Sequence, residues 1–162
     1  MHSFSQLLER LVDAGLDFVI VGGFAAVSHG SAYITQDVDI CILFSEENIA
    51  RLRQALKDLH PLHRMIPGEL SFLTEPKPGE PLTNLYLKTD FGMIDVLSTV
   101  LGIGDFRRLK QTADRLEFEG RVYQVMSLAD LIAAKEAMGR EKDLLTAKEL
   151  RAIAAKRDNP GS

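Results

Sequence analysis

A short apolar segment that runs directly into two adjacent glycines restricts this chain more than any other feature. Residues 19–30 read Val-Ile-Val-Gly-Gly-Phe-Ala-Ala-Val-Ser-His-Gly. The segment 17–22 is too apolar to have a face in water, which predicts a central strand of a sheet. Glycines after a strand are ordinary turn chemistry, but here a short helical stretch follows over residues 24–29. A second predicted strand, 37–44, then carries two carboxylates.

Those carboxylates, Asp37 and Asp39, are two residues apart. Residues i and i+2 of a strand point to the same face, so the two side chains should lie next to each other, near the glycine turn. Neighbouring carboxylates repel unless a cation lies between them. The pattern predicts a site for Mg²⁺ and a nucleotide, although an Asp-x-Asp alone also fits a strand end exposed to water.

A third carboxylate, Asp95, lies within the apolar stretch 92–97, where a charged side chain needs a partner. If this strand lies beside the one that carries Asp37 and Asp39, all three acids share one wall. Such a triad can hold two metal ions, and its third member can bind the ion that activates a hydroxyl or can act as a general base. Mg²⁺ is the expected cofactor, with Mn²⁺ as the alternative, because Mg²⁺ prefers oxygen ligands and substrate phosphates.

The order of predicted elements defines the fold class. Helices are expected over residues 3–14, 24–29, 45–59, 128–138 and 142–156, and strands over 17–22 and 37–44, with hairpins over 82–100 and 116–125. Residues 61–81 hold five of the six prolines and are expected to form a loop, with a short strand near 71–73. This order predicts an α+β (mixed α/β) domain, with one mixed sheet flanked by helices.

The length, net charge and cysteine count limit the number of domains and the classes of function. A chain of 162 residues is expected to form one domain, over residues 1–155, with a disordered tail at 156–162. The net charge of −4 argues against a strongly basic nucleic-acid binder. The single cysteine, Cys41, excludes a disulfide framework and is expected to pack as a small apolar residue. With no apolar run of transmembrane length and no signal-peptide pattern, we expect a cytoplasmic protein that does not enter a membrane.

Two blocks of the sequence resemble a known superfamily. They are Gly22-Gly23-Phe-Ala-Ala…His29-Gly30…Thr35-x-Asp37-x-Asp39-Ile and Ser127-Leu-x-Asp-Leu-Ile-x-x-Lys135-x-x-x-Gly139-Arg140-x-Lys142-Asp143. The first resembles the nucleotidyltransferase superfamily, with a polymerase beta-like fold, that includes DNA polymerase beta and kanamycin nucleotidyltransferase. Both together are similar to small bacterial nucleotidyltransferase-like proteins related to AbiEii-type toxins. The resemblance covers roughly residues 4–155.

The resemblance implies roles for particular residues. It assigns the metal and the catalytic chemistry to Asp37, Asp39 and Asp95. It assigns contacts with the nucleotide to Gly22, Gly23, Phe24, Thr35, Lys135 and Arg140. At two positions the chain departs from the usual pattern: Phe24 replaces a serine and Tyr33 replaces an arginine. The residues around Lys135 and Arg140 also fit a solvated helix face of mixed charge, with Arg140 and Asp143 paired at i, i+3.

Three functions therefore compete. The first is a Mg²⁺-dependent nucleotidyltransferase that moves a nucleoside monophosphate from an NTP to the hydroxyl of a small molecule, protein or RNA. The second, favoured by the departures at Phe24 and Tyr33, is a catalytically silent nucleotide-binding or protein-interaction module. Such a module would act with a protein partner or a second copy, for example in a toxin–antitoxin pair. The third is a site for a structural cation.

Overall fold

The computed structural model describes residues 2–30, 37–81 and 83–159, and these form six helices and nine short strands. The helices are α1 (His2–Asp13), α2 (Gly22–Ser28), α3 (Glu46–Leu56), α4 (Phe106–Thr112), α5 (Leu128–Met138) and α6 (Glu141–Asp158). The strands are β1 (Val19–Val21), β2 (Asp37–Cys41), β3 (Leu62–His63), β4 (Leu85–Thr89), β5 (Gly92–Leu97), β6 (Thr99–Val100), β7 (Gly104–Asp105), β8 (Asp114–Phe118) and β9 (Arg121–Val125).

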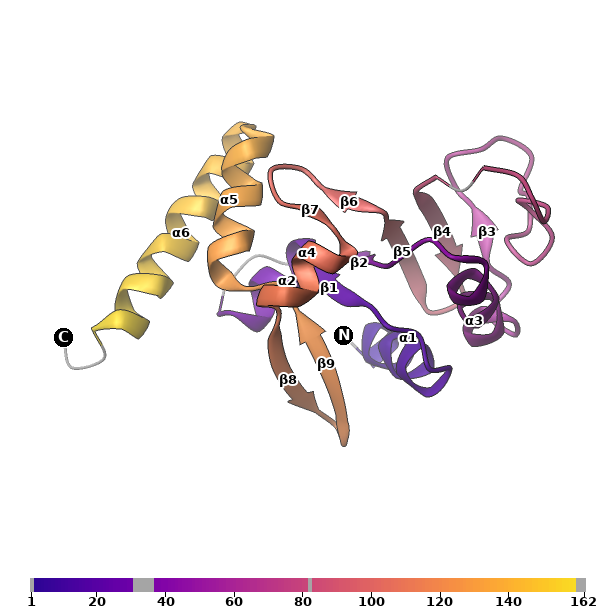
Figure 1. Ribbon diagram of the computed structural model, residues 1–162, viewed down its shortest axis with the longest axis horizontal. Helices are drawn as coiled ribbons and strands as arrows, with labels where there is room; N and C mark the ends of the chain where they lie inside the picture. The colour runs from indigo at the N-terminus through magenta and orange to yellow at the C-terminus, as the bar shows by residue number, and fades with distance from the viewer. Residues whose placement is uncertain (1, 31–36, 82, 160–162) are drawn as a thin grey trace.

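Seven of these strands form one mixed sheet, in the order β3-β4-β5-β2-β1-β9-β8, and β6 and β7 form a separate small ribbon. Strand β2 runs antiparallel to β1 and parallel to β5, and β9 runs parallel to β1. The predicted α+β fold with one mixed sheet is therefore confirmed. In Figure 1, α5 and α6 lie side by side at one end of the molecule, and α3 with the 61–81 segment lies at the other.

The core lies where the sheet meets the helices. Strand β1 is fully buried, in agreement with its apolar sequence and its place inside the sheet. Cys41 is buried among core residues, as expected for a small apolar side chain. Serine caps fix two helix starts: Ser45 accepts a hydrogen bond from the Asn48 amide before α3, and Ser127 accepts one from the Asp130 amide before α5.

Several helices and strands begin or end at residues other than those expected from the sequence. Helix α2 begins at Gly22, so the glycine pair forms its first turn and does not precede it. The hairpin expected over residues 82–100 is β4–β5, which ends at Leu97; β6 then leaves the sheet to pair with β7. The β6–β7 ribbon and α4 were not expected from the sequence. Helix α6 continues to Asp158, three residues into the segment expected to be the tail.

Candidate active site

The predicted site residues meet at a cavity of about 690 Å³ between the sheet and the α5–α6 pair. Its walls come from the end of β1, the start of α2, strands β2 and β5, the β6–β7 ribbon, α5 and the first turns of α6. The predicted residues that line it are Gly22, Gly23, Asp37, Asp39, Asp95, Lys135 and Arg140. Segments more than a hundred residues apart in sequence thus form one cleft.

The three carboxylates lie on neighbouring strands. Asp39 of β2 is paired in register with Asp95 of the parallel strand β5, and Asp37 lies two residues earlier on β2, opposite Met93. The condition stated for Asp95 is therefore met: its strand lies beside the strand that carries Asp37 and Asp39. Because alternate residues of a strand share a face, both β2 carboxylates and Asp95 line the same cavity.

The surroundings of Asp39 disfavour the ionised form of its carboxyl group. Burial raises the pKa of Asp39 to about 7, and the nearby charges of Asp95 and Asp37 act in the same direction. The ammonium of Lys135 opposes them but is too weak an influence to restore the usual value. A carboxyl in this state is partly protonated at neutral pH, and a cation bound beside it would favour its ionised form.

Gly22 is required by the position of the Asp39 side chain. Its φ of +69° lies in the left-handed region, and a Cβ added there would lie 2.1 Å from Oδ2 of Asp39. No larger residue fits without moving that carboxylate. The first glycine therefore makes room for the acid cluster, a reason that the sequence reading had not assigned to it.

Asp95 has a partner that the sequence reading missed. Nη1 of Arg64, just after β3, lies 2.5 Å from Oδ1 of Asp95. The two groups form an ion pair, and by strict hydrogen-bond geometry this buried oxygen has no partner among the described residues. Arg64 lies in the proline-rich 61–81 segment, 31 residues before Asp95, and no periodicity or spacing in that segment marks it.

The basic residues of the second sequence block also reach the cleft. Nε of Arg140 donates to Oδ2 of Asp143 at 2.6 Å, which is the i, i+3 pair of the mixed-charge reading. The face is not simply solvated, however, because the Asp143 side chain is only 2% exposed. Nζ of Lys135 lies 3.7 Å from Oδ1 of Asp143, and its side chain is 18% exposed. The hydrogen bond from Arg140 holds the pKa of Asp143 below its usual range.

The structure does not place two of the predicted nucleotide contacts in the cleft, for different reasons. Phe24 is not among the residues that line the cleft, and its partly buried side chain packs against the hydrophobic core. Thr35, like Tyr33, lies outside the described residues.

The donor set suits a cation held jointly by protein and substrate. Within the described ranges, no three His, Cys, Asp or Glu side chains form a ready-made metal cage. Mg²⁺ does not require one, because it commonly binds through one or two carboxylates together with substrate phosphates and water. Asp39, whose pKa is raised by burial and by the charges of Asp95 and Asp37, and the buried Oδ1 of Asp95, which has no hydrogen-bond partner among the described residues, fit that mode of binding.

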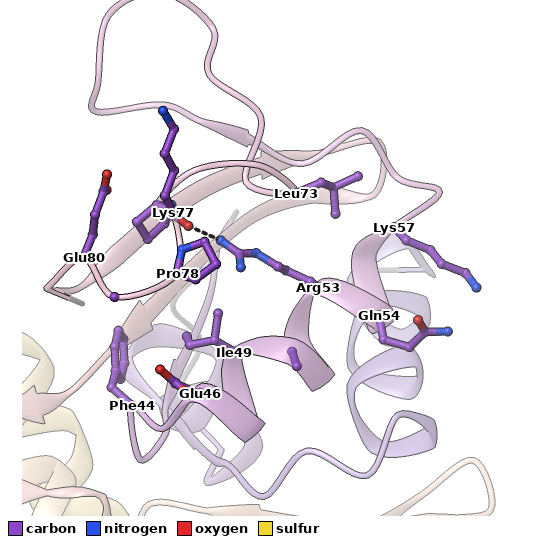
Figure 2. Close-up of a pocket in the computed structure, with 13 residues that line it drawn as sticks. Phe44, Glu46, Ile49, Arg53, Gln54, Lys57, Leu73, Lys77, Pro78 and Glu80 are labelled. Carbon is purple, nitrogen blue, oxygen red and sulfur yellow. Dashed lines mark hydrogen bonds between the residues drawn. The ribbon is translucent and has the colours of Figure 1, made fainter.

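A second cavity, of about 770 Å³, lies between α3 and the 73–80 segment (Figure 2). Its most prominent cation, Arg53, already donates to two backbone carbonyls, those of Phe72 at 2.9 Å and Pro76 at 2.6 Å. It contains none of the paired carboxylates. This arginine anchors the loop, and the smaller cleft remains the candidate active site.

Comparison with solved structures agrees with the fold. The solution structure of the antibiotic-resistance factor ANT(2'')-Ia superposes with a TM-score of 0.51 and 13% identity, over 98% of this chain and 94% of that one. The crystal structure of ANT(2'')-Ia in complex with adenylyl-2''-tobramycin gives a TM-score of 0.49 and 13% identity, over 92% and 95%. No protein-family model and no curated protein matches the chain. No helix within the described ranges is long and apolar enough to cross a membrane. The chain thus has a nucleotidyltransferase-like fold.

Proposed function

We propose that this protein is a Mg²⁺-dependent nucleotidyltransferase, which moves a nucleoside monophosphate from an NTP to an acceptor hydroxyl and releases pyrophosphate. One observation carries the proposal: three carboxylates from two adjacent strands line a single cleft, in which Asp39 and Asp95 are paired in register. The nucleotidyltransferase-like fold supports it, and the closer resemblance to AbiEii-type proteins remains a prediction.

In this proposal, Asp37 and Asp39 would hold the divalent cation beside the triphosphate. The chemistry that Mg²⁺ would supply there is neutralisation of charge on the phosphoryl group that is transferred. Lys135 and Arg140 face the same cleft and offset the remaining charge of the triphosphate. Gly22 and Gly23 allow backbone to approach it closely; contacts from Thr35 and the Phe24 backbone remain predictions.

In the same proposal, Asp95 acts on the acceptor. It orients the acceptor hydroxyl and takes its proton as the oxygen attacks the α-phosphorus. The new O–P bond forms while the bond between the α-phosphorus and the bridging oxygen breaks, so pyrophosphate leaves with that electron pair. Arg64 keeps Asp95 paired with a positive charge before the reaction.

The first test is thermal unfolding with Mg²⁺ and each of the four NTPs. A ligand that binds only the folded state at a hundredfold excess over its Kd adds about 2.7 kcal/mol of stability. The native chain should show this shift, and an Asp37→Asn/Asp39→Asn variant should lose it. Glu69→Gln/Glu80→Gln is the matched control: it removes the same charge from exposed positions outside the cleft and should keep the shift.

The second test follows label from an α-labelled NTP to small-molecule, protein and RNA acceptors. The native chain should transfer label, and Asp95→Asn should still bind Mg²⁺–NTP through Asp37 and Asp39 but transfer little, because the proton acceptor is lost. Failure to bind any nucleotide would refute the proposal. Stabilisation by Mg²⁺ or Ca²⁺ alone would indicate the structural-cation alternative.

One observation favours the silent module as the second candidate. Phe24 directs its side chain to the core where the resembling family often has a serine, so no hydroxyl is available there for phosphate. Binding of Mg²⁺–NTP without transfer to any acceptor class would favour that module and direct the search to a protein partner.

A further inference from the structure

We propose that Arg64 is an internal counter-cation of the carboxylate cluster: it pairs with Asp95 in the metal-free protein, competes with the divalent cation for that acid, and thereby sets the metal affinity of the site. The inference rests on the proposed function, since it concerns the same cluster. It adds a residue that neither of the two sequence blocks contains.

Several contacts hold the Arg64 side chain at Asp95. Its backbone amide donates to the carbonyl of Tyr86 at 3.0 Å, and its guanidinium lies 5.6 Å from the centre of the Tyr86 ring. Nη1 also donates to the carbonyl of Leu87, at 3.3 Å. Tyr86 is the cross-strand neighbour of Asp95 in the β4–β5 pair. Arg64 follows β3, two positions from β5 in the sheet, and these contacts with β4 hold its guanidinium beside the Asp95 carboxylate.

Arg64 approaches the carboxylate cluster from a different side than Lys135 and Arg140 do. Lys135 and Arg140 line the cleft, whereas Arg64 is not among its lining residues. The guanidinium thus reaches Asp95 from the β3–β4 side and leaves the cleft open to a cation and a substrate. Both side chains of the pair are mostly buried, with 22% of Arg64 and 18% of Asp95 exposed, so solvent screens their interaction only in part.

A divalent cation that uses Asp95 as a ligand must weaken the ion pair between Asp95 and Arg64. Losing a charge-assisted pair of this kind corresponds to about a tenfold change in affinity. Arg64→Gln should therefore bind metal about tenfold more tightly than the native chain. Arg64→Lys, which retains the charge, should remain within about threefold of it.

The experiment is a Mn²⁺ titration at pH 8, followed by the electron paramagnetic resonance signal of free Mn²⁺, without nucleotide. Lys88→Gln is the matched control, because it removes one charge from an exposed position on β4 and should change the affinity less than twofold. The same substitutions are repeated in an Asp95→Asn background. There Arg64→Gln should have no effect, because Arg64 acts through Asp95. If Arg64→Gln does not fold, Arg64→Met keeps the unbranched stem over Tyr86 and replaces it.

The outcomes separate this inference from the proposed function. Equal Mn²⁺ affinities for Arg64→Gln and Lys88→Gln would overturn the role of Arg64 and leave the transferase untouched. An effect of Arg64→Gln that persists with Asp95→Asn would also overturn it, since the charge would then act at long range. The expected affinities without any nucleotide-induced shift would support Arg64 and refute the transferase. No Mn²⁺ binding by any variant in the absence of nucleotide would overturn the role of Arg64, and the transferase would still be tested by the nucleotide-induced shift.

Discussion

Replacing Asp39 by asparagine should stabilise the metal-free protein, by an amount that grows with pH. The pKa of Asp39 rises from 3.8 to about 7 on folding, first because of burial and then because of Asp95 and Asp37. A carboxyl whose pKa is higher in the folded state binds more protons there than in the unfolded chain. The native protein therefore loses stability as pH rises from about 4 through 7.

The size of this loss follows from the two values. The difference between 3.8 and about 7 corresponds to a ceiling of about 4 kcal/mol, of which about 2.5 kcal/mol falls between pH 5 and pH 8. Asparagine keeps the shape of the neutral carboxyl and does not ionise. The stability advantage of Asp39→Asn over the native chain should therefore increase by up to about 2.5 kcal/mol across that range.

Urea unfolding at pH 5 and pH 8, with EDTA present, measures this advantage. Glu80→Gln changes the same charge on the exposed 61–81 segment, and its stability relative to the native chain should be nearly independent of pH. An advantage of Asp39→Asn that is constant or shrinks between pH 5 and pH 8 would refute the reasoning. It would mean that Asp39 is ionised without strain in the folded protein.

Two further substitutions test the walls of the cleft. Gly22→Ala should destabilise the protein and abolish the Mg²⁺–NTP shift, because the new Cβ meets Asp39. Gly15→Ala is the control, because Gly15 has a similar φ of +77° and an added Cβ would meet nothing within 4 Å. It should cost only about 1 kcal/mol and keep the Mg²⁺–NTP shift in thermal unfolding. Equal effects of the two substitutions would contradict the steric argument. Asp143→Asn should cost about 1 kcal/mol at pH 7 by breaking the ion pair between the buried Asp143 carboxylate and the half-exposed Arg140. Because folding lowers the pKa of Asp143, the difference in unfolding free energy should disappear as pH falls below 3.8, and a persistent difference there would contradict the ion-pair origin.

The parts of the site that could be predicted depend on local periodicity. Asp37 and Asp39 share a face because a strand has a period of two, and the apolar runs mark β1, β2 and β5 as buried strands. The meeting of Asp39 with Asp95 requires one further fact, that β5 pairs with β2. The sequence could only state that as a condition, because strand pairing depends on the whole topology.

The parts that were missed depend on contacts without local pattern. Arg64 reaches Asp95 only because the two-residue strand β3 pairs with β4, and two residues are too few for an alternation to be visible. The burial of Asp143 arises where α6 packs on α5, although charge spacing alone favours a solvated face. The ribbon β6–β7 consists of strands of two residues each and gives no period to recognise.

The distribution of charge around the cleft bears on the choice between an enzyme and a silent module. Arg64 forms an ion pair with Asp95, and Arg140 forms one with Asp143. Lys135 is 3.7 Å from Asp143, and its charge does not prevent the rise in the pKa of Asp39. The folded protein therefore carries one carboxyl group, Asp39, whose ionised form is disfavoured, and a neutral side chain there would remove that cost. A silent module has no use for such a group, whereas a site that binds a cation with its substrate uses the carboxylate as a ligand. An Asp39→Asn variant that is more stable but no longer binds Mg²⁺–NTP would show that the carboxylate serves the ligand; one that is more stable and still binds would favour the module.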